Sequence, residues 1–326
     1  MPNSRSTSRA AALLTAFVLC LSALQATAQS SGKLFHIIVP FAAGGVQDLL
    51  ARSISDDLGR ALGQTVVVEN RPGAGGTVGT GVVARATPDG QTVVMAAASH
   101  LIAPYLYAKL GYDPQKDFVP AAYIGIASYI LMIPASVPAS STGEFIKYAK
   151  ANPGKLNYAS AGNGSATHLA MAYFSGLAGI DIVHIPYKAT GEAINEVIAG
   201  RAQAVIAANI GALGFKDDKR VKLLGVTSKE RSRFVPDLPT LAESGLPNYE
   251  FTSWFGLLAP AGTPKAATDA INAAVDKLLR DPSIQERLGR QGIEFAAMPN
   301  ADFGRLLGSE SEKMAQVVKL AGLKPE

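Results

Sequence analysis

Short runs of apolar and β-branched residues alternate with runs of helical periodicity along most of this 326-residue chain. The first pair shows the pattern: the apolar run at residues 35–40 is followed by apolar residues at every fourth position from Leu50 to Leu62. Gly63 then stands where a helix C-cap glycine belongs. Because parallel strands are joined by helices that cover both sheet faces, this order predicts an α/β fold with mostly parallel, doubly wound sheets.

The alternation restarts after Pro134 and Pro138, which predicts a second lobe. We expect lobe 1 to comprise residues 29–125 and 229–326, and lobe 2 to comprise residues 126–228. Ligands of such sheets bind outside the carboxyl ends of the strands, so we expect a ligand cleft between the two lobes. The other expected strands are residues 65–69, 92–95, 156–160, 181–187, 202–208, 222–227 and 251–260. The other expected helices are residues 144–150, 165–178, 193–198, 265–280, 283–289 and 302–320. Residues 230–247 are expected to form a proline-rich connector.

The first 28 residues have the features of a secretory signal peptide. A basic start precedes an apolar stretch at residues 10–23, which is too short to span a bilayer, and Ala26-Thr27-Ala28 matches the small-residue cleavage pattern. Cys20, the only cysteine, would leave with this segment. We therefore expect a periplasmic mature chain that begins at Gln29 and has no disulfide, although it is long enough to bury a core without one.

The charge of the chain gives little reason to expect a nucleic-acid partner. The formal net charge is +4, and removal of the signal peptide lowers it to about +2. No basic stripe with interleaved aromatic residues is present, and no later apolar run is long enough to span a membrane. We expect a monomer that binds a small molecule.

The loop at residues 158–168 is the clearest candidate binding site. It follows an expected strand and opens a helix, and its glycines allow a tight turn with exposed N–H groups. Hydroxyl groups at Ser165 and Thr167 and the positive end of the helix would then favour an anion. The same residues are also explained by helix capping alone. His168 is expected to tie the loop down rather than to contact the ligand.

Two further glycine-rich loops follow expected strands. Residues 39–48 fit equally well as one wall of the ligand cleft or as an ordinary strand-to-helix turn in which Asp48 helps to start the helix. Residues 69–79 contain glycines at a dinucleotide-binding spacing, but Pro72 interrupts the turn and Asp89 precedes its strand instead of ending it. The segment after Pro72 is glycine-rich and is expected to form a helix poorly, so we interpret this loop as structural.

The sequence offers little support for catalysis or for a metal site. Ser165 and His168 are close in the chain and would suit a hydrolase, but no nucleophile-elbow motif and no orienting acid accompany them. His36, His100 and His184 lack the spacing of metal ligands, and we expect them to be structural, although His100 follows a strand end and could face the cleft. We therefore expect no catalytic residue, no metal and no cofactor.

Several short blocks along the chain, taken together, resemble the Bug family, the extracytoplasmic solute receptors of tripartite tricarboxylate transporters. The resemblance extends from about residue 33 to residue 326. The blocks are IVPF at 38–41 with Gly44, Gly45 and Asp48, VVENRPGAGG at 67–76, PDG at 88–90, YDP at 112–114, KDF at 116–118, LNYAS at 156–160 with GNG at 162–164 and His168, HIPYK at 184–188, VTS at 226–228, DLPT at 237–240 and GLLAP at 256–260.

The resemblance implies a type II periplasmic-binding-protein fold that closes on a carboxylate ligand and has no catalytic activity. It implies membrane components of a tripartite tricarboxylate-type transporter as partners; a signalling receptor that contacts a sensor is the alternative. The residues expected at the ligand fall into two groups. The loop of lobe 2 would hold one carboxylate through Ser160, Gly164, Ser165 and Thr167, Phe41, Ala43 and Gly44 would close from lobe 1, and Ser99 and Asn209 complete the set.

The chain departs from the family pattern at two places. Val46 stands where a small polar residue is common, and Ala207-Ala208-Asn209 stands where an acidic or hydroxyl residue is common. Both changes make the expected pocket less polar, and the missing acid disfavours an amino-acid ligand. We therefore expect a carboxylate with an apolar or aromatic body.

Overall fold

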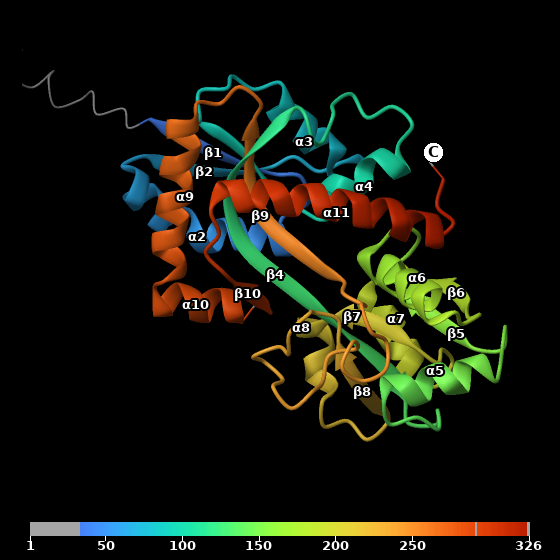
Figure 1. Cartoon of the computed structure of the whole chain (residues 1–326). Helices are drawn as coiled ribbons and strands as arrows, with labels where there is room; N and C mark the ends of the chain where they lie inside the picture. Colours follow the sequence, from blue (N-terminus) through green and yellow to red (C-terminus); the bar gives the residue numbers. More distant parts are fainter. Residues whose placement is uncertain (1–32, 291, 325–326) are drawn as a thin grey trace, which may run out of the picture.

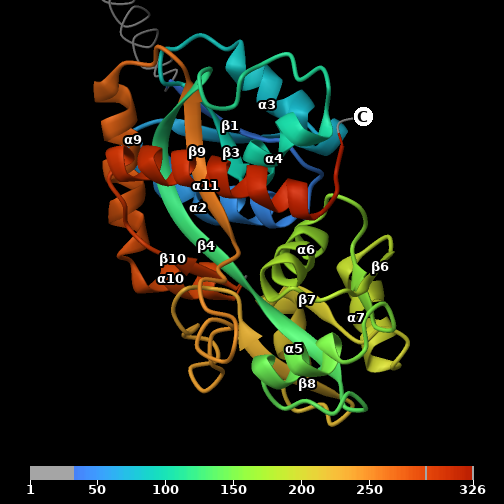
Figure 2. The same cartoon turned by 45° about the vertical axis from the view of Figure 1, so that its right-hand side comes forward.

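A single long strand, β4 (Phe118–Pro134), runs through both halves of the molecule (Figures 1 and 2). In the computed structural model, which describes residues 33–290 and 292–324, the other elements gather into two lobes around the two ends of this strand. The predicted signal peptide, residues 1–28, lies outside the described residues. Within the described part of the chain, no helix combines the length and apolar character needed to cross a membrane.

The sheet of the first lobe is mixed and has the strand order β10-β4-β9-β3-β1-β2. Strand β1 pairs in parallel with both β2 and β3, as the sequence predicts. The strands that return late in the chain, β9 and β10, pair antiparallel with β3 and β4, so the sheet is less parallel than expected. These strands are β1 (Leu34–Val39), β2 (Thr65–Asn70), β3 (Thr92–Ala97), β9 (Thr252–Pro260) and β10 (Ile293–Phe295).

Helices cover the sheet of the first lobe on its two faces (Figure 1). The four-residue apolar spacing in the first helix buries Leu50, Ile54 and Leu58 against the strands, and this helix ends where Gly63 adopts the left-handed conformation. The helices of this lobe are α2 (Val46–Leu62), the 3-10 turn η1 (Ala74–Gly76), α3 (Thr77–Ala84), α4 (Ser99–Leu106), α9 (Lys265–Leu279), α10 (Pro282–Gly289) and α11 (Asn300–Leu320).

Helix α3 corrects a sequence prediction. The glycine-rich segment after Pro72 was expected to form a helix poorly, but residues 77–84 are helical. A Cβ atom at Gly79 would lie 2.7 Å from the carbonyl oxygen of Arg71 and 2.9 Å from Cα of Pro40. The glycine thus lets the helix pack directly on neighbouring backbone, and this tertiary contact outweighs its low helix propensity.

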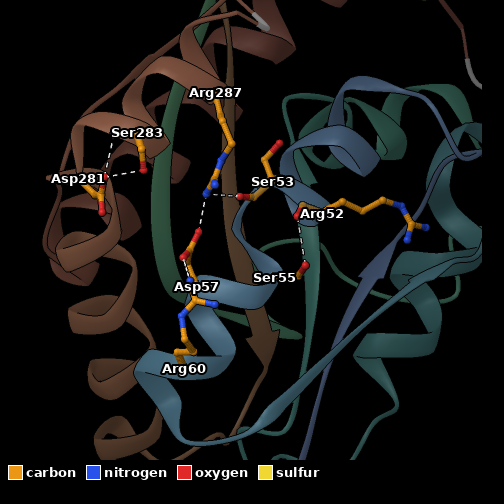
Figure 3. Close-up of polar contacts among 8 residues, drawn as sticks. All are labelled: Arg52, Ser53, Ser55, Asp57, Arg60, Asp281, Ser283 and Arg287. Carbon is orange, nitrogen blue, oxygen red and sulfur yellow. Dashed lines mark hydrogen bonds and ion pairs between the residues drawn. The ribbon is translucent and has the colours of Figure 1, made fainter.

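Polar contacts fasten α10 to α2 at the edge of the first lobe (Figure 3). The Arg287 guanidinium pairs with the Asp57 carboxylate and donates to the carbonyl oxygen of Ser53 at 2.9 Å. Asp281 caps α10 by accepting a hydrogen bond from the backbone N–H of Ser283 at 2.8 Å. Two elements more than 200 residues apart in sequence are thereby held side by side.

The second lobe forms around the carboxyl half of β4. This half pairs antiparallel with β7 and β8, while β5 and β6 form a separate parallel pair. Its core includes Ile130, Val197 and Val205, which are fully buried. The elements are β5 (Asn157–Ser160), β6 (Val183–Pro186), β7 (Val205–Ala208), β8 (Val221–Val226), α5 (Thr142–Lys150), α6 (Ala166–Ala178), α7 (Thr190–Ile198), α8 (Asn209–Ala212) and η2 (Leu213–Phe215).

Strand β4 and helix α11 connect the two lobes. The sequence analysis did not predict β4, and the expected lobe boundary at residue 125 falls in its middle. Helix α11 lies across the first lobe and ends against α6 of the second, where the Leu320 side chain packs on Gly176 (Figures 1 and 2). The predicted connector at residues 230–247 contains no helix or strand in the structure.

Candidate functional site

A cavity of about 410 Å³ lies between the two lobes. The first lobe contributes the loop after β1 and the start of α4, and the second contributes the loop before α6. Strands β4 and β9 contribute the residues where the lobes meet. The lining residues are Phe41, Gln47, Gly75, Ala97, Ala98, Ser99, Ile102, Ala103, Leu106, Tyr107, Tyr129, Asn163, Gly164, Ser165, Ala166, Phe251 and Ser253.

The wall from the first lobe is held in place by Asp48. Its carboxylate accepts hydrogen bonds from the backbone N–H of Gly44 and from the side chains of Asn70 and Arg52, each at 2.9 Å. Burial alone would raise the pKa of this carboxyl, but these hydrogen bonds outweigh it and lower the pKa. Asp48 therefore remains charged and fixes the loop that places Phe41 at the cavity.

The wall from the second lobe is the loop before α6. The Ser165 hydroxyl donates to the carbonyl oxygen of Gly162 at 2.7 Å and caps the helix by accepting from the backbone N–H of His168 at 3.3 Å. The Thr167 hydroxyl accepts from the backbone N–H of Ala161 at 2.8 Å. The loop is therefore braced by its own side chains, as the capping interpretation predicts.

A stack of three aromatic rings supports this loop from behind. Tyr158, His184 and His168 lie face to face, with 4.0 Å between the two histidine rings. The backbone N–H of Gly164 donates to Nδ1 of His168 at 3.1 Å, so His168 ties the loop down, as expected. Burial and the neighbouring His184 lower the pKa of His168 to about 4, which keeps it neutral and able to accept this bond.

The structure places four of the predicted ligand residues at the cavity: Phe41, Ser99, Gly164 and Ser165. The other five do not line it. Ser160 and Asn209 are completely buried: the Ser160 hydroxyl lies 2.6 Å from Nε2 of His184, and the Asn209 amide donates to the carbonyl oxygen of Gly292 at 3.2 Å. Ala43 and Gly44 lie beside Phe41 in the same loop, and Thr167 is buried behind Ser165.

The sequence analysis predicted Phe41 but missed the other aromatic residues of the lining, Tyr107, Tyr129 and Phe251. Tyr129 and Phe251 meet edge to face at 5.7 Å, and Tyr107 follows α4. Tyr107 could have been predicted from the sequence. It ends the segment that follows the expected strand at residues 92–95, and ligands bind beyond the carboxyl ends of such strands. Tyr129 gave no signal, because it lies within the continuous apolar run of β4.

The Ser165 and His168 pair lacks the geometry that a hydrolase would need. Among the described residues, no hydrogen bond joins the Ser165 hydroxyl to the His168 ring, whose Nδ1 is occupied by Gly164. His100 does not reach the interlobe cavity: it is buried against Tyr112 and Phe118, and burial lowers its pKa to about 4. In the same part of the chain, no three His, Cys, Asp or Glu residues are grouped as metal ligands would be.

Two α/β lobes that enclose a cavity between them are the fold of periplasmic solute-binding proteins, one of which is a solved relative of this chain. The chain belongs to the tripartite tricarboxylate transporter receptor family (TctC), whose family model matches residues 50–323. This is a family of solute-binding receptors and not of enzymes, which confirms the predicted family, fold class and non-enzymatic role.

Individual relatives agree with this assignment. A UPF0065 protein encoded in the tcbD–tcbE intergenic region of Pseudomonas sp. strain P51 is 35% identical over 282 residues, which cover 86% of this chain and 84% of that protein. A protein of R. palustris solved with adipate is 31% identical with a TM-score of 0.74 and covers 90% of this chain and 98% of its own. The periplasmic binding protein BugD is 34% identical with a TM-score of 0.70 and covers 90% and 99%.

Proposed function

We propose that this protein is a periplasmic receptor that captures a small organic carboxylate with an apolar or aromatic body between its lobes. It then presents this ligand to the membrane components of a tripartite tricarboxylate-type transporter. In this proposal the lobes correspond to residues 29–125 with 229–326 and to residues 126–228, and the mature chain begins at Gln29 after signal cleavage. N-terminal sequencing of the protein recovered from the periplasm tests the cleavage site.

The observation that carries the proposal is the composition of the interlobe cavity. No Asp, Glu, Lys, Arg or His is present among its lining residues, and aliphatic and aromatic side chains form most of it. Its volume lies at the lower end of the range of small-molecule sites, about 300–1,000 Å³. A ligand that fills this space gains most from an apolar body.

Polar groups from both lobes line this cavity and can hold a carboxylate. The Ser99 hydroxyl lies in the first turn of α4, and Ser165 caps α6 from the opposite lobe. Helix N-termini and hydroxyl donors both favour a negative charge. We propose that lobe closure brings Gly164, Ser160 and Thr167 to the same carboxylate, with Phe41, Ala43 and Gly44 closing from the first lobe and Asn209 contributing from the second.

The relatives support the carboxylate part of this proposal. The R. palustris protein was solved with adipate, an acid whose two carboxylates are joined by an apolar chain. In this chain Val46 and the Ala207-Ala208-Asn209 segment stand where polar residues are expected from the family pattern, and the cavity lining itself contains no charged side chain. The body of the ligand, rather than a second charged group, is therefore expected to determine specificity.

Calorimetry on the ligand-free mature protein tests the proposal. We expect benzoate-like aromatic acids or other apolar carboxylates to bind, and Ser99→Ala to weaken that binding about tenfold or more, because a hydrogen bond to a charged group contributes about 1.5–3 kcal/mol. Ser309→Ala is the matched control, since Ser309 is also a helical serine but bonds to Leu306 far from the cavity. Tight binding of aspartate or glutamate without binding of aromatic acids would contradict the proposal.

A further inference from the structure

A second cavity, of about 530 Å³, lies behind the loop that lines the interlobe cavity. Helix α6 and the segment before β6 form two of its sides, and the end of α11 with the residues after it forms another. Asn163 lines both cavities, so the loop before α6 is common to them. The polar residues of the second cavity are Tyr158, Asn163, His168, Ser175, Asp181 and His184.

The Ser175 hydroxyl oxygen is buried and makes no hydrogen bond within the described structure, although Ser175 lines the cavity. A buried polar group without a partner costs about 1–3 kcal/mol. The oxygen has almost no accessible surface, so the side chain must rotate toward the cavity to donate to a ligand, and such a bond would remove this cost.

The two stacked histidines differ in their ability to take up a proton. Nδ1 of His168 accepts from the backbone N–H of Gly164, so its single proton is on Nε2, and a second proton would break that bond. Nε2 of His184 faces the Ser160 hydroxyl at 2.6 Å, and a hydroxyl can either donate or accept. His184 can therefore become doubly protonated without losing its partner, because Ser160 then accepts.

The surroundings of His184 favour a ring that is neutral without ligand and becomes protonated when an anion binds. Tyr158 stacks on its ring at 4.8 Å, and an aromatic face attracts positive charge. In the empty cavity burial lowers the pKa of His184, which keeps the ring neutral. The other titratable lining residues are Tyr158, His168 and Asp181; Asp181 is exposed, and its charge disfavours ligands with several negative charges.

We propose that this cavity is a second binding site for a singly charged carboxylate, which binds together with a proton taken up by His184 and accepts a hydrogen bond from Ser175. A metal ion fits the same residues poorly. The two histidine rings are parallel to within 6°, so their nitrogen lone pairs lie in separate parallel planes and do not converge on one ion.

The site joins two parts of the protein that belong to different lobes in the proposed division. Its ligand would contact the end of α11 on one side and the back of the α6 loop on the other. A carboxylate bound here would therefore stabilise this arrangement of the lobes. The inference does not depend on the identity of the ligand in the interlobe cavity.

The test is NMR on the mature protein labelled with ¹⁵N-histidine, with acetate as the probe. We expect acetate to raise the titration midpoint of His184 by about one pH unit. His36 and His100, which lie in the first lobe outside this cavity, are internal references and should not respond. Because a proton binds with each acetate, the affinity should rise toward tenfold per pH unit as the pH falls from about 7.5 to about 6.

The matched variant is Ser175→Ala, which removes the free hydroxyl and leaves the interlobe lining unchanged. We expect it to weaken acetate binding at His184 about fivefold, the equivalent of one neutral hydrogen bond, and to leave ligand binding in the interlobe cavity unaltered. The proposal is overturned if acetate leaves His184 unmoved, or shifts all four histidines alike, or binds equally well to the Ser175→Ala protein. Absence of carboxylate binding in the interlobe cavity of the unmodified protein, with the His184 response intact, would instead contradict the proposed function alone.

Discussion

Ser165 has two roles in one side chain. Its hydroxyl caps α6 and, through Gly162, shapes the loop whose surface lines the interlobe cavity. Helix stability and ligand binding are therefore both expected to depend on this residue. A second N-cap serine elsewhere in the chain allows the two contributions to be separated.

We predict that Ser165→Ala lowers the free energy of unfolding by about 1 kcal/mol through loss of the cap, and also weakens carboxylate binding. Ser141→Ala is the control, because Ser141 caps α5 in the same manner by accepting from Glu144 and does not line the cavity. Urea unfolding and calorimetry on both variants measure the two effects. Equal ligand affinity in the two variants would exclude Ser165 from the site.

Two buried histidines predict how stability changes with pH. The pKa values of His100 and His168 are lowered to about 4, whereas an unfolded histidine titrates near 6.5. Above pH about 6.5 these groups are neutral in both states and add no pH dependence. As the pH falls from about 6.5 to about 4, the unfolded chain binds protons that the folded chain does not, so stability falls, by on the order of 3 kcal/mol for His100.

Urea unfolding at a series of pH values across this range measures the effect. His100→Gln should flatten the dependence on pH, whatever it does to the stability at neutral pH, because one titrating group is removed. His36 bonds to Glu69 near the surface, and His36→Gln is the comparison. An unchanged slope in the His100→Gln protein would show that His100 is protonated in the folded state.

Residue-level inference from the sequence succeeded where local chemistry dictates structure. Gly63 and Ser165 are found at the helix ends that their residue types predict. It did not find Tyr129 and Phe251, because their meeting at the cavity depends on how β4 and β9 pair over a long sequence separation. Ser160 and Thr167 lie in a loop that resembles that of the family, yet their hydroxyls are occupied by the His184 ring and by the backbone N–H of Ala161.

At the scale of elements, helix α10 depends on contacts with α2 as well as on its own cap. Arg287 provides the link through Asp57 and Ser53 (Figure 3), whereas Arg290 pairs with Glu286 within α10 itself. Both arginines are partly or largely exposed, so each interaction is expected to be weak.

We predict that Arg287→Ala lowers the free energy of unfolding by about 0.5–1 kcal/mol, and Arg290→Ala by less than about 0.5 kcal/mol. The difference arises because only Arg287 connects two elements and also bonds to a backbone carbonyl. Urea unfolding at low and high salt measures both values. A larger cost for Arg290→Ala would show that the contact with α2 does not stabilise α10.

Elements with strong local periodicity were predictable, and those shaped by distant contacts were not. Helix α2 carries four-residue apolar spacing and was predicted from it. Helix α3 carries two glycines, Gly79 and Gly81, and forms because Gly79 allows close packing on Pro40 and Arg71. No rule based on local propensity contains that information.

At the scale of the whole molecule, Gly125 allows β4 to pass beside β10. A Cβ atom there would lie 2.4 Å from the carbonyl oxygen of Glu294 and 2.7 Å from Cα of Phe295. We predict that Gly125→Ala lowers the free energy of unfolding by about 2–3 kcal/mol, because backbone atoms of a paired strand cannot move aside cheaply. Gly308→Ala is the control: that position in α11 is open, so the helix should gain up to about 1 kcal/mol.

Urea unfolding followed by circular dichroism compares the two glycine variants, and ligand affinity reports whether the lobes still meet correctly. A Gly125→Ala protein as stable as the parent would mean that β10 does not lie against β4 in solution. If Gly308→Ala were destabilised instead, the Gly308 position would not be open in solution, contrary to the structure.

Because the single strand β4 pairs in the sheets of both lobes, the lobes cannot be exchanged as separate units. A gene fragment that begins at residue 126 would encode only the second part of this strand, and the remaining chain would lose residues 126–128, which pair with the start of β9 and with β10. Each piece would expose an unpaired sheet edge, which favours aggregation. Chimeras that transfer ligand specificity between relatives should therefore exchange β4 and β9 together with the loops that they support.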